Sequence, residues 1–179
     1  MGKIKTLYFI RNAKADWDDI DASDFERGIT KKGKKDIKTM SSYLKLKNIM
    51  PDTIISSCAL RAQQTVDIIL ENLEYKNRVV YLKELYYTPT VTLLEILAMQ
   101  DDSIETIFVV GHNPQLTDIA NMLIDDHISK IPSSGIVAMK FDIKEWHDVI
   151  YTKGELDFFI TPKQFKYYMP KQIRAILEN

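Results

Sequence analysis

The sequence lacks the features that mark several large classes of protein. It has one cysteine, Cys58, so no disulfide can form within the chain. No apolar run reaches the roughly 18–20 residues of a membrane span, and the first residues lack the apolar region and cleavage site of a secretory signal. We therefore expect a protein of a reducing cytoplasm that does not bind membranes.

An excess of charge of one sign is also lacking. The 24 Lys and Arg residues almost balance the 25 Asp and Glu residues, which gives a formal net charge of −1. No global field attracts nucleic acid, so we expect no such partner, and any anion site must be local. The sequence contains neither a Gly-x-x-x-x-Gly-Lys-Ser/Thr loop nor a Gly-x-Gly-x-x-Gly turn, which disfavours binding of nucleoside triphosphates and dinucleotides.

Histidine is scarce, and its placement excludes the common metal motifs. The three histidines, His112, His127 and His147, are scattered, and together with the single cysteine they show no metal-ligand spacing. We therefore expect neither a metal nor another cofactor. His127 and His147 lie outside every motif described below, and we interpret them as surface or structural residues.

What the sequence does contain is a regular alternation of strand-like and helix-like segments. Short segments rich in branched or aromatic residues predict strands over 5–10, 53–56, 78–82, 106–110 and 136–141. Amphipathic patterns predict helices over 31–47, 60–73, 90–99 and 115–124, the first with Thr30 as its N-cap. The 179 residues suit a single α/β domain, with a mostly parallel central sheet and helices on both faces.

The pattern is weaker after Phe141. We predict a further edge strand over Trp146–Thr152, another strand over Leu156–Ile160 and a partly helical tail over Pro162–Leu177. From about residue 144 the chain is interpreted as a C-terminal extension of the domain. The tail mixes basic and aromatic residues, and we expect it to pack on the body, with a binding surface as the alternative.

Polar residues follow the predicted strands at the sheet edge where open α/β sheets bind ligands. Arg11 and Asn12 follow the first strand and His112 follows the fourth, while Arg61 opens a helix after the second. An Arg guanidinium offers a bidentate fork to a phosphoryl group, and His can donate a further hydrogen bond to an oxyanion. We predict that Arg11, Arg61 and His112 converge on one phosphate.

Each of these residues also has a simpler interpretation. Arg11 could form a surface ion pair, and Arg61 could pair with Asp67 or Glu71 on its own helix face. His112 could be a packing or capping residue before a proline. We favour phosphate binding for all three because of the motifs around them.

Four blocks of sequence resemble, in order and spacing, motifs of the histidine phosphatase superfamily. They are residues 11–14, 24–33, 56–65 and 109–114, at or beside predicted strand and helix ends within residues 4–143. The form is that of SixA-like phosphohistidine phosphatases, which have Arg-His-Ala-Lys where this chain has Arg11-Asn12-Ala13-Lys14. The resemblance implies a phosphoglycerate mutase-like three-layer sandwich and a phosphatase that acts on protein phosphohistidine or small phosphoesters.

Position 12 departs from the motif. In this family the residue there is a nucleophilic His that forms a phosphohistidine, which water then hydrolyses. The amide nitrogen of Asn12 is not a useful nucleophile, and loss of a nucleophile costs on the order of 10⁶ in rate. We therefore expect phosphate binding with almost no turnover. Two explanations fit the sequence: Asn12 is native, or it is a deliberate replacement of His that traps a ligand.

The resemblance also raises the question of a proton donor. Glu84 matches the place where many superfamily members hold the acid that protonates the leaving group, although an exposed Glu after a strand is common. Lys14 and Asp16 begin a loop over the predicted pocket. The turn at residues 133–135 could offer hydroxyl or N–H groups to a phosphate, and a plain turn is the alternative.

Two other functions are compatible with these motifs. One is a non-catalytic module that recognises phosphorylated partners. The other is a phosphoglycerate mutase-like transferase, which we disfavour because no long insertion is present to form a lid over the substrate. The compact length predicts an open, shallow pocket, which would suit a phosphohistidine presented on a protein surface.

Overall fold

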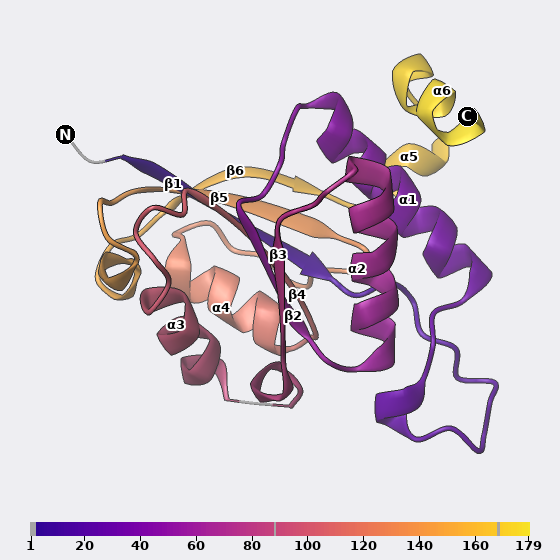
Figure 1. Cartoon of the computed structure of the whole chain (residues 1–179), viewed down its shortest axis with the longest axis horizontal. Helices are drawn as coiled ribbons and strands as arrows, with labels where there is room; N and C mark the ends of the chain where they lie inside the picture. Colours follow the sequence, from indigo (N-terminus) through magenta and orange to yellow (C-terminus); the bar gives the residue numbers. More distant parts are fainter. Residues whose placement is uncertain (1–2, 88, 168) are drawn as a thin grey trace.

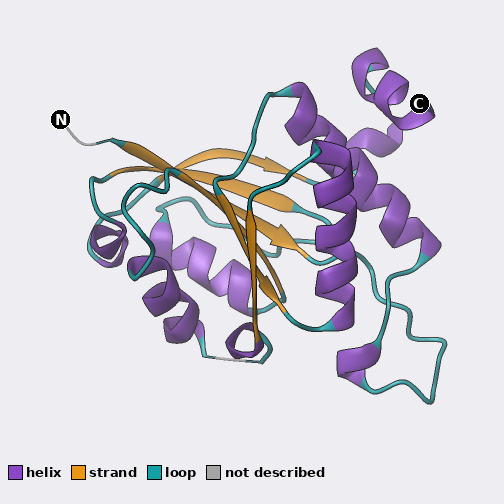
Figure 2. Cartoon of the chain, in the orientation of Figure 1, coloured by secondary structure: helices purple, strands orange, loops and turns teal. Residues whose placement is uncertain are grey.

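A computed structural model describes residues 3–87, 89–167 and 169–179, and these form one six-stranded sheet with helices on both faces (Figures 1 and 2). The strands are β1 (Ile4–Arg11), β2 (Thr53–Ser57), β3 (Arg78–Leu82), β4 (Thr106–Gly111), β5 (Ile136–Asp142) and β6 (Glu155–Ile160). Their order is β3-β2-β4-β1-β5-β6. The first four strands in this order run parallel, and β5 is antiparallel to both of its neighbours. The α/β class and the mostly parallel sheet are confirmed.

Helices cover the two faces in pairs (Figure 1). The helices are α1 (Lys31–Leu46) and α2 (Leu60–Leu73) on one face, and α3 (Thr90–Ala98) and α4 (Gln115–Leu123) on the other. Side chains of β1 alternate between the two cores: Leu7 and Phe9 belong to one, Tyr8 and Ile10 to the other. A strand buried on both faces has a continuous apolar run, which is why the sequence predicted this one well.

The start of α1 is fixed beside the end of β1. Thr30 caps the helix as predicted, since its hydroxyl accepts a hydrogen bond of 2.9 Å from the backbone N–H of Gly33. A Cβ atom at Gly33 would lie 2.8 Å from the carbonyl oxygen of Lys14. Glycine therefore lets the helix approach the loop after β1, and this close packing holds that loop near the carboxyl edge of the sheet.

The predicted edge strand over Trp146–Thr152 is wrong. Residues Trp146–Ile150 form a 3₁₀ helix, η3. Trp146 and Val149 are buried three residues apart, which matches the three-residue turn of that helix. The Trp146 indole N–H donates to the carbonyl of Ile104 at 2.8 Å, and its backbone N–H donates to Asp102 Oδ1 at 2.7 Å. These anchors favour a helical turn over a sheet edge.

The C-terminal tail is helical and packs on the body. It contains α5 (Gln164–Tyr167) and α6 (Lys171–Glu178), and α6 contacts α1. Ile173 of α6 is fully buried, which confirms that the tail covers the domain as expected. Among the described residues, no helix combines the length and apolar character needed to cross a membrane.

Candidate active site

The carboxyl ends of β1, β2 and β4 bring three polar side chains together. Arg11 is in register with Gly111, so the next residues of the two chains, Asn12 and His112, lie side by side. The backbone N–H of Asn12 donates to the carbonyl of Gly111 at 3.0 Å, which fixes this pairing. Ser57 ends β2 on the other side of β4. We call Asn12, Ser57 and His112 the floor of the site.

Hydrogen bonds connect the three side chains of the floor in a row, from Ser57 through His112 to Asn12. His112 Nδ1 lies 3.0 Å from Asn12 Oδ1, and His112 Nε2 lies 2.7 Å from Ser57 Oγ. The amide nitrogen of Asn12 donates to the carbonyl of Ala13 at 2.9 Å, so Oδ1 is left to accept from His112. The imidazole therefore carries its proton on Nδ1 and accepts at Nε2 from the Ser57 hydroxyl.

His112 is uncharged at neutral pH. Burial, together with the positive charges of Arg61 and Arg11, lowers the pKa of His112 to about 4, against an opposing effect of the Asp24 carboxylate. A neutral imidazole can donate only one N–H, and here that donor points at Asn12.

The connectivity Ser57–His112–Asn12 matches that of a serine nucleophile, a histidine base and an orienting amide. Two observations argue against this role. Ser57 is fully buried, so no substrate phosphorus can reach its hydroxyl. The low pKa of His112 makes it a weak base. The chain of bonds therefore positions His112 and Asn12.

Two arginines lie beside the floor. Arg11, at the end of β1, donates from Nη1 to the carbonyl of Ile131 at 3.0 Å, and among the described residues no carboxylate pairs with it. Burial lowers the pKa of Arg11, and the positive charge of Arg61 adds to this effect. Two like charges held together in a partly buried site repel each other, and a bound anion would relieve that repulsion.

Residues of the third sequence block fix the position of Arg61. The hydroxyl of Thr65 donates to the carbonyl of Arg61 at 2.7 Å and accepts from the backbone N–H of Ala13 at 2.9 Å. Gln64 accepts from the backbone N–H of Ile29 at 2.8 Å. The first turns of α2 are therefore tied both to the end of β1 and to the loop that precedes α1.

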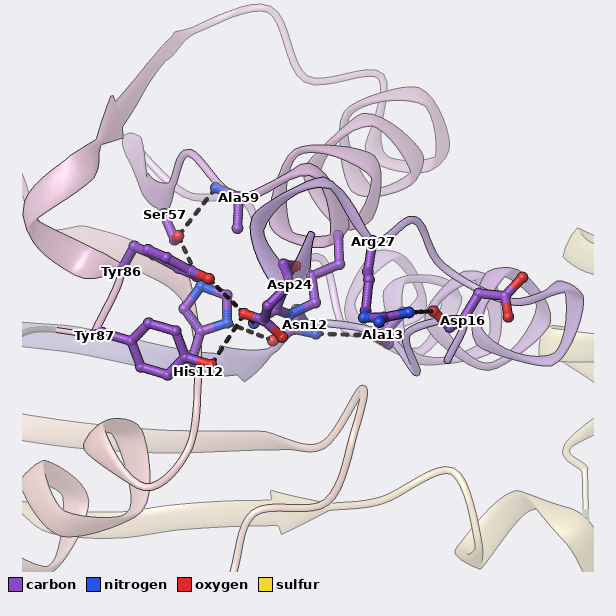
Figure 3. Close-up of polar contacts among 11 residues, drawn as sticks. Asn12, Ala13, Asp16, Asp24, Arg27, Ser57, Ala59, Tyr86, Tyr87 and His112 are labelled. Atoms are coloured by element: carbon purple, nitrogen blue, oxygen red, sulfur yellow. Dashed lines mark hydrogen bonds and ion pairs between the residues drawn. The ribbon is translucent and has the colours of Figure 1, made fainter. Parts of the chain in front are cut away.

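A second polar cluster lies beside the floor, where Asp24, Tyr86 and Tyr87 gather near Asn12 and His112 (Figure 3). Asp24 belongs to the short 3₁₀ helix η1 (Asp24–Glu26), and Tyr86 and Tyr87 follow the 3₁₀ helix η2 (Lys83–Leu85). Both tyrosine hydroxyls donate to Asp24 Oδ2, that of Tyr87 at 3.0 Å. Arg61 donates to the same oxygen at 3.2 Å and to the backbone carbonyl of Asp24 at 2.7 Å. We call Asp24, Tyr86 and Tyr87 the rim.

The rim holds a stable negative charge. Burial alone would raise the pKa of Asp24, but hydrogen bonds from Tyr86 and Tyr87 and the charge of Arg61 lower it below the usual value. Burial and the neighbouring carboxylate raise the pKa of Tyr86, so its hydroxyl stays protonated and donates. The Tyr86 ring also meets the edge of His112 at 5.7 Å between centroids, which joins the rim to the floor.

Other residues singled out in the sequence are placed less centrally. Glu84 is exposed in η2, and within the described part of the chain its side chain makes no hydrogen bond or ion pair. Lys14 is exposed on the loop after β1. His127 and His147 are exposed, in agreement with their interpretation as surface residues.

The turn at residues 133–135 contacts the end of β1 through its backbone. The N–H of Ser134 donates to the carbonyl of Arg11 at 3.1 Å, and the residue has a positive φ of 61°. Its side chain is fully buried, and its hydroxyl has no partner among the described residues. This turn therefore supports the strand end that carries Arg11 and Asn12.

Two wide grooves of the molecule lie away from the site. Two grooves of about 670 and 690 Å³ run along α1 and the C-terminal helices, and none of the predicted site residues lines them. Within the described ranges, no three His, Cys, Asp or Glu side chains gather closely enough to hold a metal ion. The chemistry available to the site is therefore that of its arginines, His112, Asn12 and the rim.

The sequence did not identify the roles of the rim or of Ser57 and Thr65. Asp24, Ser57 and Thr65 lie inside the recognised blocks, but nothing in their spacing indicated their partners. Arg61 pairs with Asp24, 37 positions away, rather than with Asp67 or Glu71 of its own helix. Such pairings depend on how the loops fold back over the sheet, and loops carry no periodic pattern of apolar residues that would predict their path.

Comparisons with known proteins agree on the fold. No family model matches the sequence. An uncharacterised protein of Mycobacterium tuberculosis is 27% identical over 150 residues, which cover 78% of this chain and 91% of that protein.

Solved structures give a fuller match. A protein of Agrobacterium tumefaciens assigned as the phosphohistidine phosphatase SixA superposes with a TM-score of 0.77 and 25% identity, covering 88% of this chain and 98% of that one. The protein histidine phosphatase SixA in complex with tungstate gives a TM-score of 0.78 at 20% identity, covering 90% and 99%. These comparisons show a histidine phosphatase-like fold, with SixA phosphohistidine phosphatases among the structural neighbours of the chain.

Proposed function

We propose that this chain is a SixA-like phosphatase scaffold that binds a phosphoryl group between Arg11 and Arg61, beside the ring of His112, and barely turns it over. The natural ligand class is a phosphohistidine on a protein or a small phosphorylated molecule. The observation that carries the proposal is the pair of arginines that repel each other beside a neutral His112. An anion with several oxygens is the ligand that satisfies such a cradle.

The role of Asn12 follows from its position. Asn12 Oδ1 lies 3.0 Å from His112 Nδ1, and the resemblance to SixA-like phosphatases makes position 12 the one from which a nucleophile would attack a phosphorus atom held by the arginines. A His at position 12 would form a bond to phosphorus and displace the leaving group, and water would then release phosphate. Asn12 supplies no such nucleophile, so the chain as it stands holds the ligand without forming the intermediate.

The test is to restore the imidazole with Asn12→His and to use Asn12→Gln as the matched control. We expect Asn12→His to hydrolyse para-nitrophenyl phosphate at least about 10³-fold faster than the unaltered chain, and Asn12→Gln to show no gain. Mass spectrometry after an alkaline quench should find a phosphoryl group on residue 12 only in Asn12→His. Absence of both turnover and phosphate binding in every variant would contradict the proposal.

A non-catalytic module that recognises phosphorylated partners is the second candidate. It is favoured by the hydrogen bonds of the floor, because both polar atoms of the Asn12 amide already have partners within the protein. If Asn12→His binds phosphate as well as the unaltered chain does but gains no turnover, the module is the better description. Glu84 is then not needed as an acid. In either case we infer a cytoplasmic setting from the single Cys58.

A further inference from the structure

The rim carboxylate uses its two oxygens unequally. Asp24 Oδ2 accepts from Arg61, Tyr86 and Tyr87, whereas among the described residues Oδ1 accepts from none. The two oxygens of a carboxylate together accept about four hydrogen bonds, so Oδ1 has unused capacity. The side chain of Asp24 is 29% exposed and that of Arg61 only 8%. The Asp24 side chain is therefore the more exposed partner of this ion pair.

The negative charge of Asp24 lies beside an arginine that we expect to bind phosphate, and this placement needs a physical reason. Arg61 has five N–H donors and directs two of them at Asp24, so others remain for a phosphate. The carboxylate beside it repels any phosphate that binds there, because like charges in a partly buried site oppose each other strongly. Only a ligand that also brings a positive charge or a strong N–H donor can compensate for that repulsion.

We propose that Asp24 determines specificity: with Tyr86 and Tyr87 it forms a leaving-group subsite that selects phosphoryl groups carried on a protonated nitrogen ring over those carried on oxygen. This inference rests on the proposed function. Oδ1 accepts the N–H of the ring nitrogen that does not bear phosphorus. The rings of Tyr86 and Tyr87, whose centroids are 4.4 Å apart, offer an aromatic surface to the cationic ring.

The chemistry of a phosphohistidine fits this subsite. Its second ring nitrogen titrates near neutral pH, as imidazoles do. When that nitrogen carries its proton, cleavage of the P–N bond leaves the bonding electron pair on the departing nitrogen and releases a neutral imidazole. No further proton is required, so the subsite needs a carboxylate that stabilises the ring proton rather than an acid that supplies one. An alkyl ester of the same peptide brings no such donor, and its alkoxide leaving group needs a proton.

The experiment measures equilibrium binding, which the near absence of turnover allows. Two peptides of identical sequence carry either phosphohistidine or phosphoserine at the same position, and inorganic phosphate serves as a reference. Calorimetric titration at pH 7 gives the ratio of their dissociation constants. The variant is Asp24→Asn, and the matched control is Asp18→Asn, which removes the same charge from an exposed position on the same loop.

We expect the unaltered chain and Asp18→Asn to bind the phosphohistidine peptide about tenfold or more tightly than the phosphoserine peptide, the size of one charged hydrogen bond. In Asp24→Asn the dissociation constants of the two peptides should lie within about twofold of each other. The main reason is that the phosphoserine peptide and inorganic phosphate bind more tightly once the carboxylate charge is gone. If Asp24→Asn instead weakens all three ligands equally, Asp24 only tethers Arg61 and the leaving-group subsite is overturned.

The unaltered chain gives a second readout that needs no variant. Between pH 7 and pH 8.5 the phosphohistidine ring loses its proton while Asp24 stays ionised. The ratio by which the chain binds the phosphohistidine peptide more tightly than the phosphoserine peptide should therefore fall several-fold. A ratio that does not change with pH overturns the subsite. The proposed function fails separately: if inorganic phosphate does not bind at all, both are wrong, whereas equal binding of the two peptides with phosphate binding intact refutes the subsite alone.

Discussion

The floor and the rim of the candidate site differ in origin and in charge. Asn12, Ser57 and His112 stand at the ends of parallel strands, are buried, and form a neutral network. The rim comes from two loop segments and holds an ionised carboxylate that is partly exposed. In the function and the subsite that we propose, the strand ends place the phosphate, while the loops select what the phosphate is attached to.

The largest expected effect tests the neutrality of the floor. Asn12→Asp keeps the size of the side chain but adds a negative charge 3.0 Å from His112 Nδ1. We expect phosphate affinity to fall at least about 100-fold, since a like charge in the cradle costs several kcal/mol. The same change should raise the pKa of His112. Titration calorimetry measures the affinity, and unchanged binding would contradict the placement of phosphate on the floor.

The burial of His112 predicts a pH dependence of stability. Its pKa of about 4 lies below the ordinary value of 6.5, so the unfolded chain takes up a proton first as the pH falls. Stability is therefore retained above pH 6.5 and lost between pH 6.5 and 4, by roughly 3 kcal/mol for this group. Urea unfolding at several pH values should show a flatter profile in His112→Gln, whereas His127→Gln, at an exposed position, should keep the profile of the unaltered chain.

Arg61 connects the floor to the rim, and a change of its shape tests that connection. Arg61→Lys keeps the charge but cannot donate at once to the Asp24 carboxylate, the Asp24 carbonyl and a phosphate. We expect phosphate to bind about tenfold more weakly, which corresponds to roughly 1.4 kcal/mol. A lysine variant that binds phosphate as tightly as the unaltered chain would show that the guanidinium fork is unimportant.

The smallest effect is expected at the outer part of the rim. Tyr87 is 65% exposed, and Tyr87→Phe removes only its 3.0 Å hydrogen bond to Asp24. The free energy of unfolding should change by less than about 1 kcal/mol. Inorganic phosphate affinity should stay within about twofold. A loss of phosphate binding as large as that of Arg61→Lys would mean that the rim and the floor are not separate parts.

The sequence pointed to Asn12 and His112 of the floor, although not to the role of Ser57, because both residues follow predicted strands. Once β1 and β4 are recognised as neighbouring parallel strands, Asn12 and His112 must meet at the same edge. The six strands and the four long helices lie within one residue of their predicted limits, because apolar runs mark the strands and amphipathic patterns mark the helices. The Trp146–Thr152 segment was mispredicted because its two buried residues also fit a strand-like composition.

The rim could not be predicted in this way. Asp24 reaches Arg61 across 37 positions of chain and Tyr86 across 62, through loops that carry no hydrophobic period. Neither the spacing nor the composition of those loops indicates which carboxylate meets which hydroxyl. The sequence instead drew attention to Glu84, which lies two residues before Tyr86. The side chain of Glu84 is exposed. Whether Glu84 donates a proton stays a prediction.

The central claim is that a phosphoryl group binds directly beside His112. Titration of inorganic phosphate into the unaltered chain, followed by NMR of the three histidine rings, tests this most directly. We predict a saturable shift of the His112 ring signals and a rise of its pKa from about 4, because a nearby dianion stabilises the imidazolium, while the exposed His127 and His147 stay unchanged. If His112 does not respond, or if all three rings shift alike, phosphate does not bind at the floor and the account is wrong.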